Sequence, residues 1–247
     1  MEKKPAYPQT GVASTCRSYE EYERMFGFET DKLTGKKVLD VAGGASSFTA
    51  QLCARGIDAY AADPFYAGDR QAVVALAQRE IDTSSAKIAA MSQVYDWSYY
   101  GSPERHRRIR EASLESFAVH FQSETDKERY LAASLPRLPF ENDTFSLILC
   151  SHFLFLYADQ FGEAFHEAAL RELLRAAKPG GEIRIYPLVT LAWETVPYLD
   201  RLLDVLAAES EASLVPCGLP FVPRESSVLV LRKKDESCGM KIRQNET

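Results

Sequence analysis

Residues 37–48 place the strongest constraint on what this chain can fold into. The apolar run from Val38 to Val41 is interrupted only by Asp40, and small residues then lead into a helical pattern that begins at Phe48. A continuous apolar run is typical of a strand that is buried on both faces. Glycines let the following turn approach a ligand closely, and the free N–H groups of the helix start face the same space. The segment therefore predicts a strand, a glycine turn and a helix that together bind a ligand.

The same strand-then-helix pattern returns along much of the chain. A second strand is expected over 58–62, and it should end at Pro64 because proline cannot donate to a ladder. Asp63 then lies about 20 residues beyond the glycine turn, where an acid of a nucleotide-binding sheet meets a ribose. Further strands are expected at 129–133, 145–150, 182–186, 214–215 and 227–231, and helices at 18–28, 158–177 and 196–208. The fold class is therefore α/β, with a Rossmann-like, doubly wound and mostly parallel sheet.

Residues 65–128 break this pattern. Three helical patterns, at 69–81, 84–95 and 102–121, follow one another without a convincing strand. A bare crossover between parallel strands needs far less chain, so a helical insertion between the second and third strands is expected. The predicted organisation is an N-terminal helical segment (1–35), a main domain (36–232) that contains a helical lid (65–128), and a charged tail (233–247).

Charge and composition limit the possible partners. Lys plus Arg is 29 and Asp plus Glu is 35, so the net charge is −6, which gives no bulk attraction to nucleic acid. The five cysteines are scattered without a C-x-x-C pair, so neither a disulfide framework nor a metal site is expected. No signal peptide and no membrane span are expected either, and reduced thiols favour a cytoplasmic location.

Four sequence blocks, in order, resemble the class I S-adenosylmethionine-dependent methyltransferases. The blocks are VLDVAGGASSF, AYAADP, LPRLPFENDTFSLILCSHFLFLY and LLRAAKPGGEIRIY. The resemblance covers about residues 36–63 and 129–232. It implies the cofactor S-adenosyl-L-methionine and methyl transfer to an acceptor. The acidic charge and the aromatic insertion favour a small organic molecule as that acceptor.

The resemblance also implies roles for individual residues. Ala42, Gly43 and Gly44 would pass under the methionine part of the cofactor, with Asp40 beneath them. Asp63 would bind the ribose hydroxyls, and Pro64 would flank the adenine. The remaining cofactor contacts would come from Ser134 and Leu135 at the adenine edge and from Cys150 and Ser151 on the floor beside the sulfonium. His152 is the only candidate for a catalytic base, although a purely structural role is about equally supported.

The chain departs from the family pattern at several positions. Ala42 and Ser46 stand where glycine is frequent, so Ser46 needs an ordinary φ or a capping role at the helix start. Ser134 replaces the acid that often contacts adenine. The asparagine-proline motif of amino-methylating nucleic-acid enzymes is absent after the fourth strand, where Ser151 and His152 stand instead. Methylation of a base amine in the manner of those enzymes is therefore disfavoured.

Other interpretations remain open at this point. The turn does not fit G-x-G-x-x-G, which disfavours a dinucleotide. The arginines between Arg105 and Arg110 are interpreted as a solvated helix face, with an anion site as the sharper alternative. Arg17 is a further guess, as a residue that closes over the cofactor carboxylate. The alternatives to a small-molecule methyltransferase are a non-catalytic S-adenosylmethionine-binding protein and an RNA methyltransferase that uses the arginine-rich helix.

Overall fold

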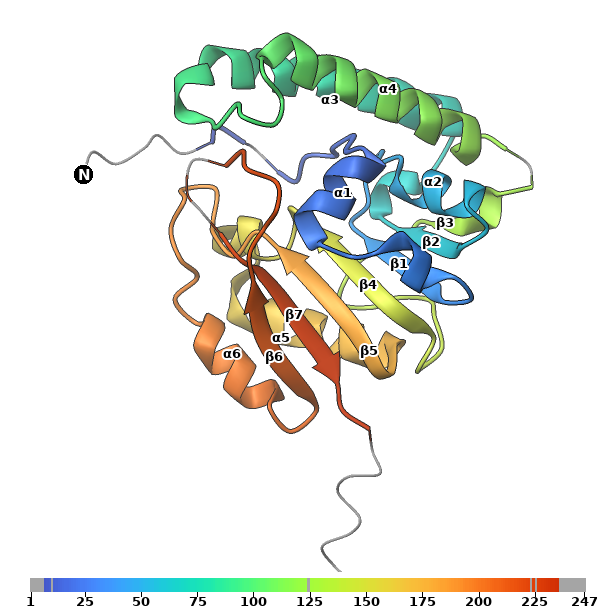
Figure 1. The fold of residues 1–247 in the computed structure, drawn as a ribbon, viewed down its shortest axis with the longest axis vertical. Helices are drawn as coiled ribbons and strands as arrows, with labels where there is room; N and C mark the ends of the chain where they lie inside the picture. The colour runs from blue at the N-terminus through green and yellow to red at the C-terminus, as the bar shows by residue number, and fades with distance from the viewer. Residues whose placement is uncertain (1–6, 10, 124, 223, 225, 236–247) are drawn as a thin grey trace, which may run out of the picture.

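A computed structural model describes residues 7–9, 11–123, 125–222, 224 and 226–235. Its sheet has seven strands in the order β3-β2-β1-β4-β5-β7-β6 (Figure 1). The strands are β1 (Lys37–Val41), β2 (Asp58–Ala62), β3 (Tyr130–Leu131), β4 (Phe145–Ser151), β5 (Ala177–Tyr186), β6 (Ser210–Val215) and β7 (Val228–Lys233). Strands β1 to β5 are parallel, while β7 runs antiparallel to both β5 and β6. The predicted fold class, a mostly parallel doubly wound sheet with a helical insertion after β2, is confirmed.

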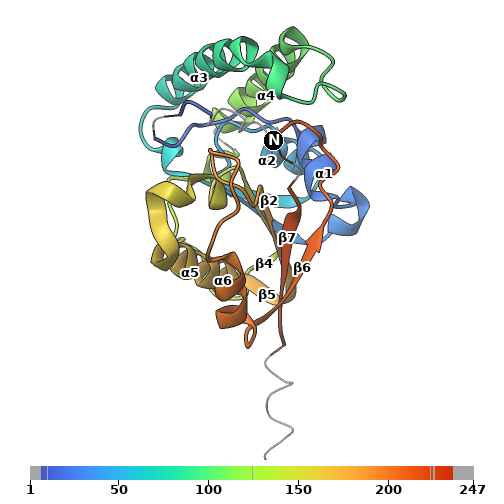
Figure 2. The same cartoon turned by 90° about the vertical axis from the view of Figure 1, so that its left-hand side faces the viewer.

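The helices cover both faces of this sheet. They are α1 (Tyr19–Phe26), α2 (Phe48–Ala54), α3 (Arg70–Ala90), α4 (Pro103–Phe121), α5 (Ala158–Ala176) and α6 (Leu199–Leu206). One core cluster joins α1 and α2 to one face of the sheet, and another joins α5 and α6 to the opposite face (Figure 2). Alternate residues of β4 take part in the two clusters: Leu147 and Leu149 in the first, Ile148 and Cys150 in the second. This two-sided burial explains the continuous apolar run of β4.

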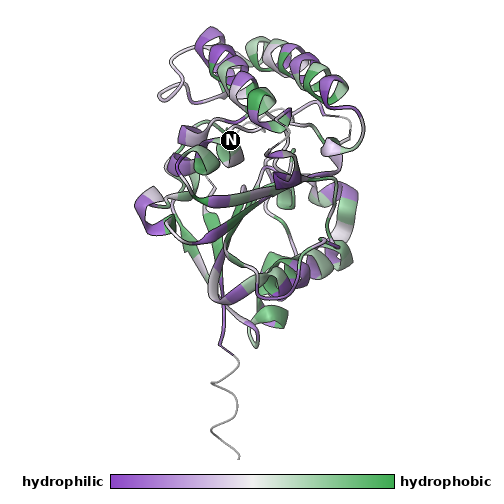
Figure 3. Cartoon of the chain, turned by 90° about the vertical axis from the view of Figure 1, so that its right-hand side faces the viewer, coloured by the Kyte–Doolittle hydropathy of each residue, from purple (hydrophilic) through white to green (hydrophobic). Residues whose placement is uncertain are grey.

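The segment between β2 and β3 differs in part from the sequence-based expectation. Helix α3 runs without interruption from Arg70 to Ala90, so the first two expected helices are one. Together α3 and α4 form the α3–α4 hairpin, which lies across the end of the sheet at which β1 and β4 finish (Figure 1). Polar and apolar residues alternate along both helices in Figure 3, as expected of helices with one buried and one exposed side.

Helix α1 lies within the expected range, 18–28, and is shorter at both ends. The Ser18 hydroxyl accepts from the Glu21 amide at 3.3 Å, and the Glu21 carboxylate accepts from the Ser18 amide at 2.7 Å. This capping box fixes the first turn, and Gly27, with φ of 63°, ends the helix.

Strand β5 begins earlier than expected, at Ala177 and not at Glu182. Ala177 pairs with Phe145 and Glu182 pairs with Leu147, so residues 178–181 form an irregularity opposite a single residue of β4. The glycines at 180 and 181, which belong to the fourth family-like block, are therefore part of a bulge inside the strand. Most of the predicted charged tail, residues 236–247, lies outside the described residues.

Candidate functional site

The glycine turn after β1 folds tightly over Asp40. Ala42 and Gly44 both have positive φ, 55° and 54°. A Cβ at Gly43 would stand 2.8 Å from Oδ2 of Asp40 and 2.9 Å from the Tyr66 hydroxyl, which leaves no room for a side chain. The Ser46 hydroxyl accepts from the Phe48 amide at 3.0 Å, although the N-cap of α2 is Ser47, and Ser46 has the ordinary φ that was the other expectation. Alanine at position 42 is thus held in the left-handed region that glycine adopts more readily.

Asp63, at the tip of β2, holds the glycine turn in place. Its Oδ2 accepts from the Gly44 amide at 2.9 Å and its Oδ1 accepts from the Phe65 amide at 2.8 Å. Burial raises the pKa of this carboxyl, while the two backbone donors lower it. Each carboxylate oxygen has room for a second hydrogen bond. Asp63 can therefore support the turn and accept from two ligand hydroxyls at the same time.

A cleft of about 260 Å³ opens at the carboxyl ends of the strands and contains half of the predicted cofactor residues. Ala42, Asp63, Pro64, Ser134 and Leu135 line it. The opposite wall is formed by residues that the sequence did not single out as binding residues: Phe153, Phe161 and Phe165, together with Val12 and others. Two of them, Phe161 and Phe165, are four residues apart, a spacing that is typical of one face of a helix. This cavity is called the cofactor cleft below.

The other predicted cofactor residues do not line this cleft. Asp40 is buried beneath the turn, where both of its carboxylate oxygens lie 3.1 Å from the Tyr22 hydroxyl, and burial raises its pKa well above the ordinary range. Cys150 and Ser151 are buried under the same surface, and burial raises the pKa of the Cys150 thiol to about 12. Neither residue lines the cofactor cleft, and their predicted place beside the sulfonium stays a prediction.

His152 lies at the carboxyl end of β4 in an uncommon backbone conformation, with φ of 53°. Its amide donates to the Tyr186 carbonyl at 2.6 Å, and its Nδ1 lies 3.0 Å from the Ser151 hydroxyl. Burial lowers the pKa of the imidazole well below its usual range, and Arg17 and Arg110 lower it further. The ring is thus neutral near pH 7 and faces a second cavity.

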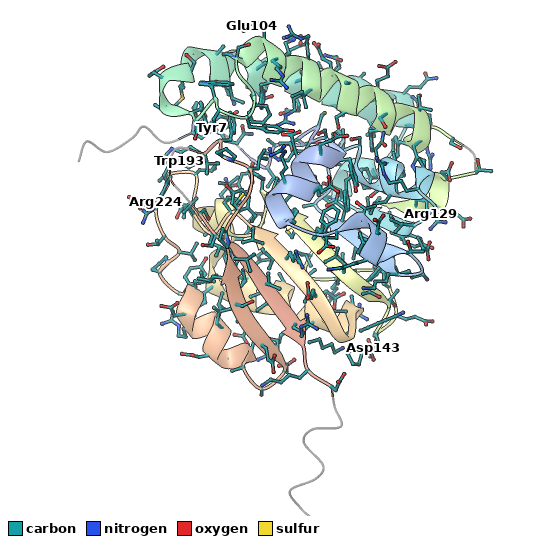
Figure 4. The ribbon with its side chains drawn as sticks, viewed as in Figure 1. Tyr7, Glu104, Arg129, Asp143, Trp193 and Arg224 are labelled. Carbon is teal, nitrogen blue, oxygen red and sulfur yellow. The ribbon has the colours of Figure 1, made fainter. Side chains whose placement is uncertain are left out.

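This second cavity lies under the α3–α4 hairpin and is called the hairpin cavity below. Its volume is about 100 Å³. Aromatic side chains supply much of its wall: Tyr7, Tyr95, Tyr157, Trp193 and Phe221. Figure 4 shows Tyr7 and Trp193 near each other below one end of the hairpin, and the Tyr7 amide donates to the Leu191 carbonyl at 2.9 Å. Segments from both ends of the chain therefore close this cavity.

Residues 12–17 separate the two cavities. Val12 lines the cofactor cleft, whereas residues 13–17 line the hairpin cavity. The carbonyls of Thr15 and Arg17 accept from the amides of Ala45 and Ser47, each at 3.1 Å. The segment is thus fixed to the start of α2 by backbone hydrogen bonds, which satisfy amides that the helix itself leaves without partners.

A buried cluster of charged groups supports the same wall. Glu21 pairs with Arg110 and accepts from the Tyr100 hydroxyl, and its carboxylate lies 3.8 Å from the Arg17 guanidinium. Burial alone would raise the pKa of Glu21, but Arg110, with support from Arg17, holds it at about 2. Sequence patterns do not reveal this cluster, because its members lie on α1, on the segment before α1, on α4 and just before α4.

The arginine-rich stretch of α4 is only partly the solvated face that was expected. Arg105 and Arg108 are exposed, and Arg107 pairs with Asp82 and Glu111. His106 and Arg110, in contrast, are buried and belong to the hairpin cavity. The expectation of a uniform surface face is therefore wrong for these two residues, which lie one helical turn apart on the inward side.

Comparisons with known proteins found a methyltransferase-domain model and a relative that are similar to this chain. A family model described as a methyltransferase domain matches residues 104–185. An uncharacterized protein of Methanocaldococcus jannaschii is 28% identical over 218 residues, which are 88% of this chain and 94% of that protein. Among the described residues, no helix combines the length and apolarity required to cross a membrane.

Two solved structures illustrate how distant the structural likenesses are. The 1,6-didemethyltoxoflavin-N1-methyltransferase of Burkholderia thailandensis has a TM-score of 0.40 at 16% identity, over 83% of this chain and 76% of that one. The 16S rRNA (adenine(1408)-N(1))-methyltransferase of Catenulisporales acidiphilia has a TM-score of 0.40 at 15% identity, over 84% and 91%. Likenesses at this level do not identify an acceptor. The resemblance to the class I methyltransferases thus has the support of a methyltransferase-domain model that matches residues 104–185, and the predicted fold class is confirmed.

Proposed function

We propose that this chain transfers a methyl group from S-adenosyl-L-methionine to a small organic acceptor, in keeping with the methyltransferase-domain model that matches part of it. The observation that carries this proposal is the position of Asp63. Its carboxylate faces a cleft of about 260 Å³ at the carboxyl ends of β1 and β2 and is already oriented by two backbone amides. Ligands of open α/β sheets bind at this edge, and ribose hydroxyls suit such an acceptor-only group.

The residues around the cleft fit the remainder of the cofactor. Leu135 and the phenylalanines at 153, 161 and 165 offer apolar and aromatic surface to an adenine ring. Ser134 is exposed at the rim and can hydrogen-bond a ring edge. When bound, S-adenosyl-L-methionine would supply an electrophilic methyl group on a sulfonium. Two ionisable side chains next to the turn, Asp40 and Asp63, are carboxylates. They are not thiols or amines, which would compete with the acceptor for the methyl group.

The hairpin cavity is proposed as the acceptor site, with residues 65–128 as its lid. It excludes water from an acceptor, and its fixed aromatic walls would align that acceptor with the cofactor cleft. His152 lines the cavity as a neutral imidazole that is able to take a proton from the acceptor. Two adjoining cavities favour a transferase over a protein that only binds the cofactor.

Binding of the cofactor is the first expected outcome. Isothermal titration of the full chain with S-adenosylmethionine and S-adenosylhomocysteine should give one site for each ligand. Circular dichroism shows whether the protein is folded. If a folded protein binds neither ligand, the proposed function is overturned. Binding without methyl transfer to any member of a broad acceptor panel would instead support the non-catalytic alternative.

His152→Asn tests the proposed base. Asparagine tolerates the left-handed backbone at this position better than alanine does, so the variant should fold. We expect kcat to fall by about 100-fold or more, in the range of general-base contributions, with little change in cofactor affinity. A kcat equal to that of the wild type, measured by release of S-adenosylhomocysteine, would show that His152 has only a structural role.

An RNA acceptor is less well supported. The exposed arginines of α4 are few, and Arg107 is engaged by two acids. An RNA acceptor would be supported if the chain binds RNA with an affinity that falls steeply with salt concentration. This binding should be lost in a variant without Arg105 and Arg108.

A further inference from the structure

The hairpin cavity contains buried polar atoms for which the fold provides no partner. Ser14 Oγ, Arg17 Nε, Tyr95 Oη and His106 Nδ1 all belong to residues that line it, and none of these atoms has a hydrogen-bond partner among the described residues. The side chains of Arg17, Tyr95 and His106 are more than nine-tenths buried. Buried polar atoms are rarely left without a partner, because each one costs free energy. Four of them around one cavity therefore indicate a polar ligand.

The chemistry of these atoms is that of hydrogen-bond donors. Arg110 Nη2 lies 3.1 Å from His106 Nε2, and a guanidinium can only donate. His106 Nε2 is therefore the acceptor of that bond, and in the neutral ring the proton is on Nδ1. Burial, together with Arg110, lowers the pKa of His106 to about 2, so the ring is indeed neutral. Arg17 Nε is also a donor, and the two hydroxyls can donate.

The charges of the buried side chains also favour a ligand that accepts hydrogen bonds. The buried part of the wall carries two guanidinium groups, Arg17 and Arg110, but only one carboxylate, Glu21. Arg110 is satisfied by Glu21, whereas Arg17 lies farther from that carboxylate, at 3.8 Å. The other acid on the wall, Glu80, is only half-buried, so water screens its charge more effectively. The inner end of the cavity is thus cationic and rich in donors.

We propose that the hairpin cavity binds a small organic carboxylate, whose oxygens accept from Arg17 and His106. A carboxylate is an acceptor-only group with two oxygens, which matches a wall of donors. The cavity, at about 100 Å³, is smaller than the roughly 150 Å³ cavity that admits a single benzene ring, which favours a small molecule over a polymer segment. The aromatic residues Tyr95 and Phe221, whose rings stack on each other with centroids 4.7 Å apart, form part of the apolar lining that would contact the rest of the molecule.

This inference rests on the proposed function in one respect: the carboxylate is taken to be the methyl acceptor, not a part of the cofactor. Binding of the acid can nevertheless be measured by itself. The probe is benzoate, and its neutral counterpart of the same shape is benzamide. Both are titrated into the full chain, with and without saturating S-adenosylhomocysteine.

We expect benzoate to bind at least tenfold more tightly than benzamide, and Arg17→Met to remove most of this difference. Arg17→Lys, which keeps the charge, should restore part of it. Glu80→Gln is the matched control, because it removes a negative charge from the same wall and should strengthen benzoate binding. Equal affinities of the two probes for the wild type would overturn the proposal, as would a difference that survives Arg17→Met. Thermal melts of each variant establish that it is folded.

A final comparison separates the acceptor from the cofactor. S-adenosylhomocysteine carries a carboxylate, and 5′-methylthioadenosine does not. If Arg17→Met weakens binding of the first but not of the second, while benzoate does not bind, Arg17 holds the carboxylate of the cofactor and the inference is wrong. If benzoate binds as expected but S-adenosylhomocysteine does not bind at all, the proposed function fails while the carboxylate site stands.

Discussion

Asp63→Asn should weaken the binding of S-adenosylmethionine by about 10- to 100-fold. The substitution keeps one oxygen and the shape of the side chain but removes the charge, and a hydrogen bond to a charged group contributes about 1.5–3 kcal/mol. Asp63→Ala should have a larger effect, because the amides of Gly44 and Phe65 would also lose their acceptor. Isothermal titration of the two variants measures both affinities.

Asp58→Asn is the matched control for this experiment. Asp58 begins the same strand that Asp63 follows, and it pairs with Arg129 and Lys37 at the opposite end of the sheet. Its replacement should leave cofactor affinity unchanged. Equal affinities for wild type and Asp63→Asn would place the ribose elsewhere and would contradict the proposed site.

Glu21→Gln should lower the free energy of unfolding by about 3–5 kcal/mol. The carboxylate is fully buried and is the partner of Arg110, and removing one member of a buried pair leaves the other charge uncompensated. Because Arg17 lies beside the same group, two guanidiniums would be affected. Urea denaturation followed by circular dichroism gives the difference. Glu20→Gln, at the exposed neighbouring position of the same helix turn, should change stability very little.

The same pair predicts how stability depends on pH. The pKa of Glu21 is lowered to about 2, below the value of about 4.3 in an unfolded chain. Its contribution is therefore complete above the unfolded pKa and is lost as the pH falls toward 2, because the unfolded state binds the proton more readily. Between these two values the stability of Glu21→Gln should fall less steeply than that of the wild type. Parallel pH profiles would contradict the assigned ion pair.

The elements that the sequence predicts best are those with a local signal. Strand β2 has the predicted bounds, Asp58 to Ala62, because Pro64 ends it, and α1 begins after Ser18 and ends before Gly27 through its own caps. The merging of two expected helices into α3 could not be predicted in the same way. The stretch from Thr83 to Ser85 weakens the helical pattern, and it is the packing of α3 on α4 that supports helix there.

The sequence predicts the part of the candidate site that lies at the carboxyl ends of neighbouring strands. Asp63 and Ala42 lie where the ends of β2 and β1 must meet. The charged cluster and the wall of the hairpin cavity depend on contacts between residues far apart in the chain, such as Glu21 with Arg110. Periodicity within one helix does not reveal such pairs, so the arginines of α4 looked alike in the sequence although only some point inward.

The partition formed by residues 12–17 has a consequence for how such a protein can diverge. Its carbonyls at Thr15 and Arg17 are tied to the start of α2, so the wall is anchored on the side of the glycine turn. The hairpin cavity, in contrast, is lined in part by α3, α4 and the segment near Phe221, none of which lines the cofactor cleft. Substitutions in these elements would therefore change the walls of the hairpin cavity and leave the lining of the cofactor cleft as it is.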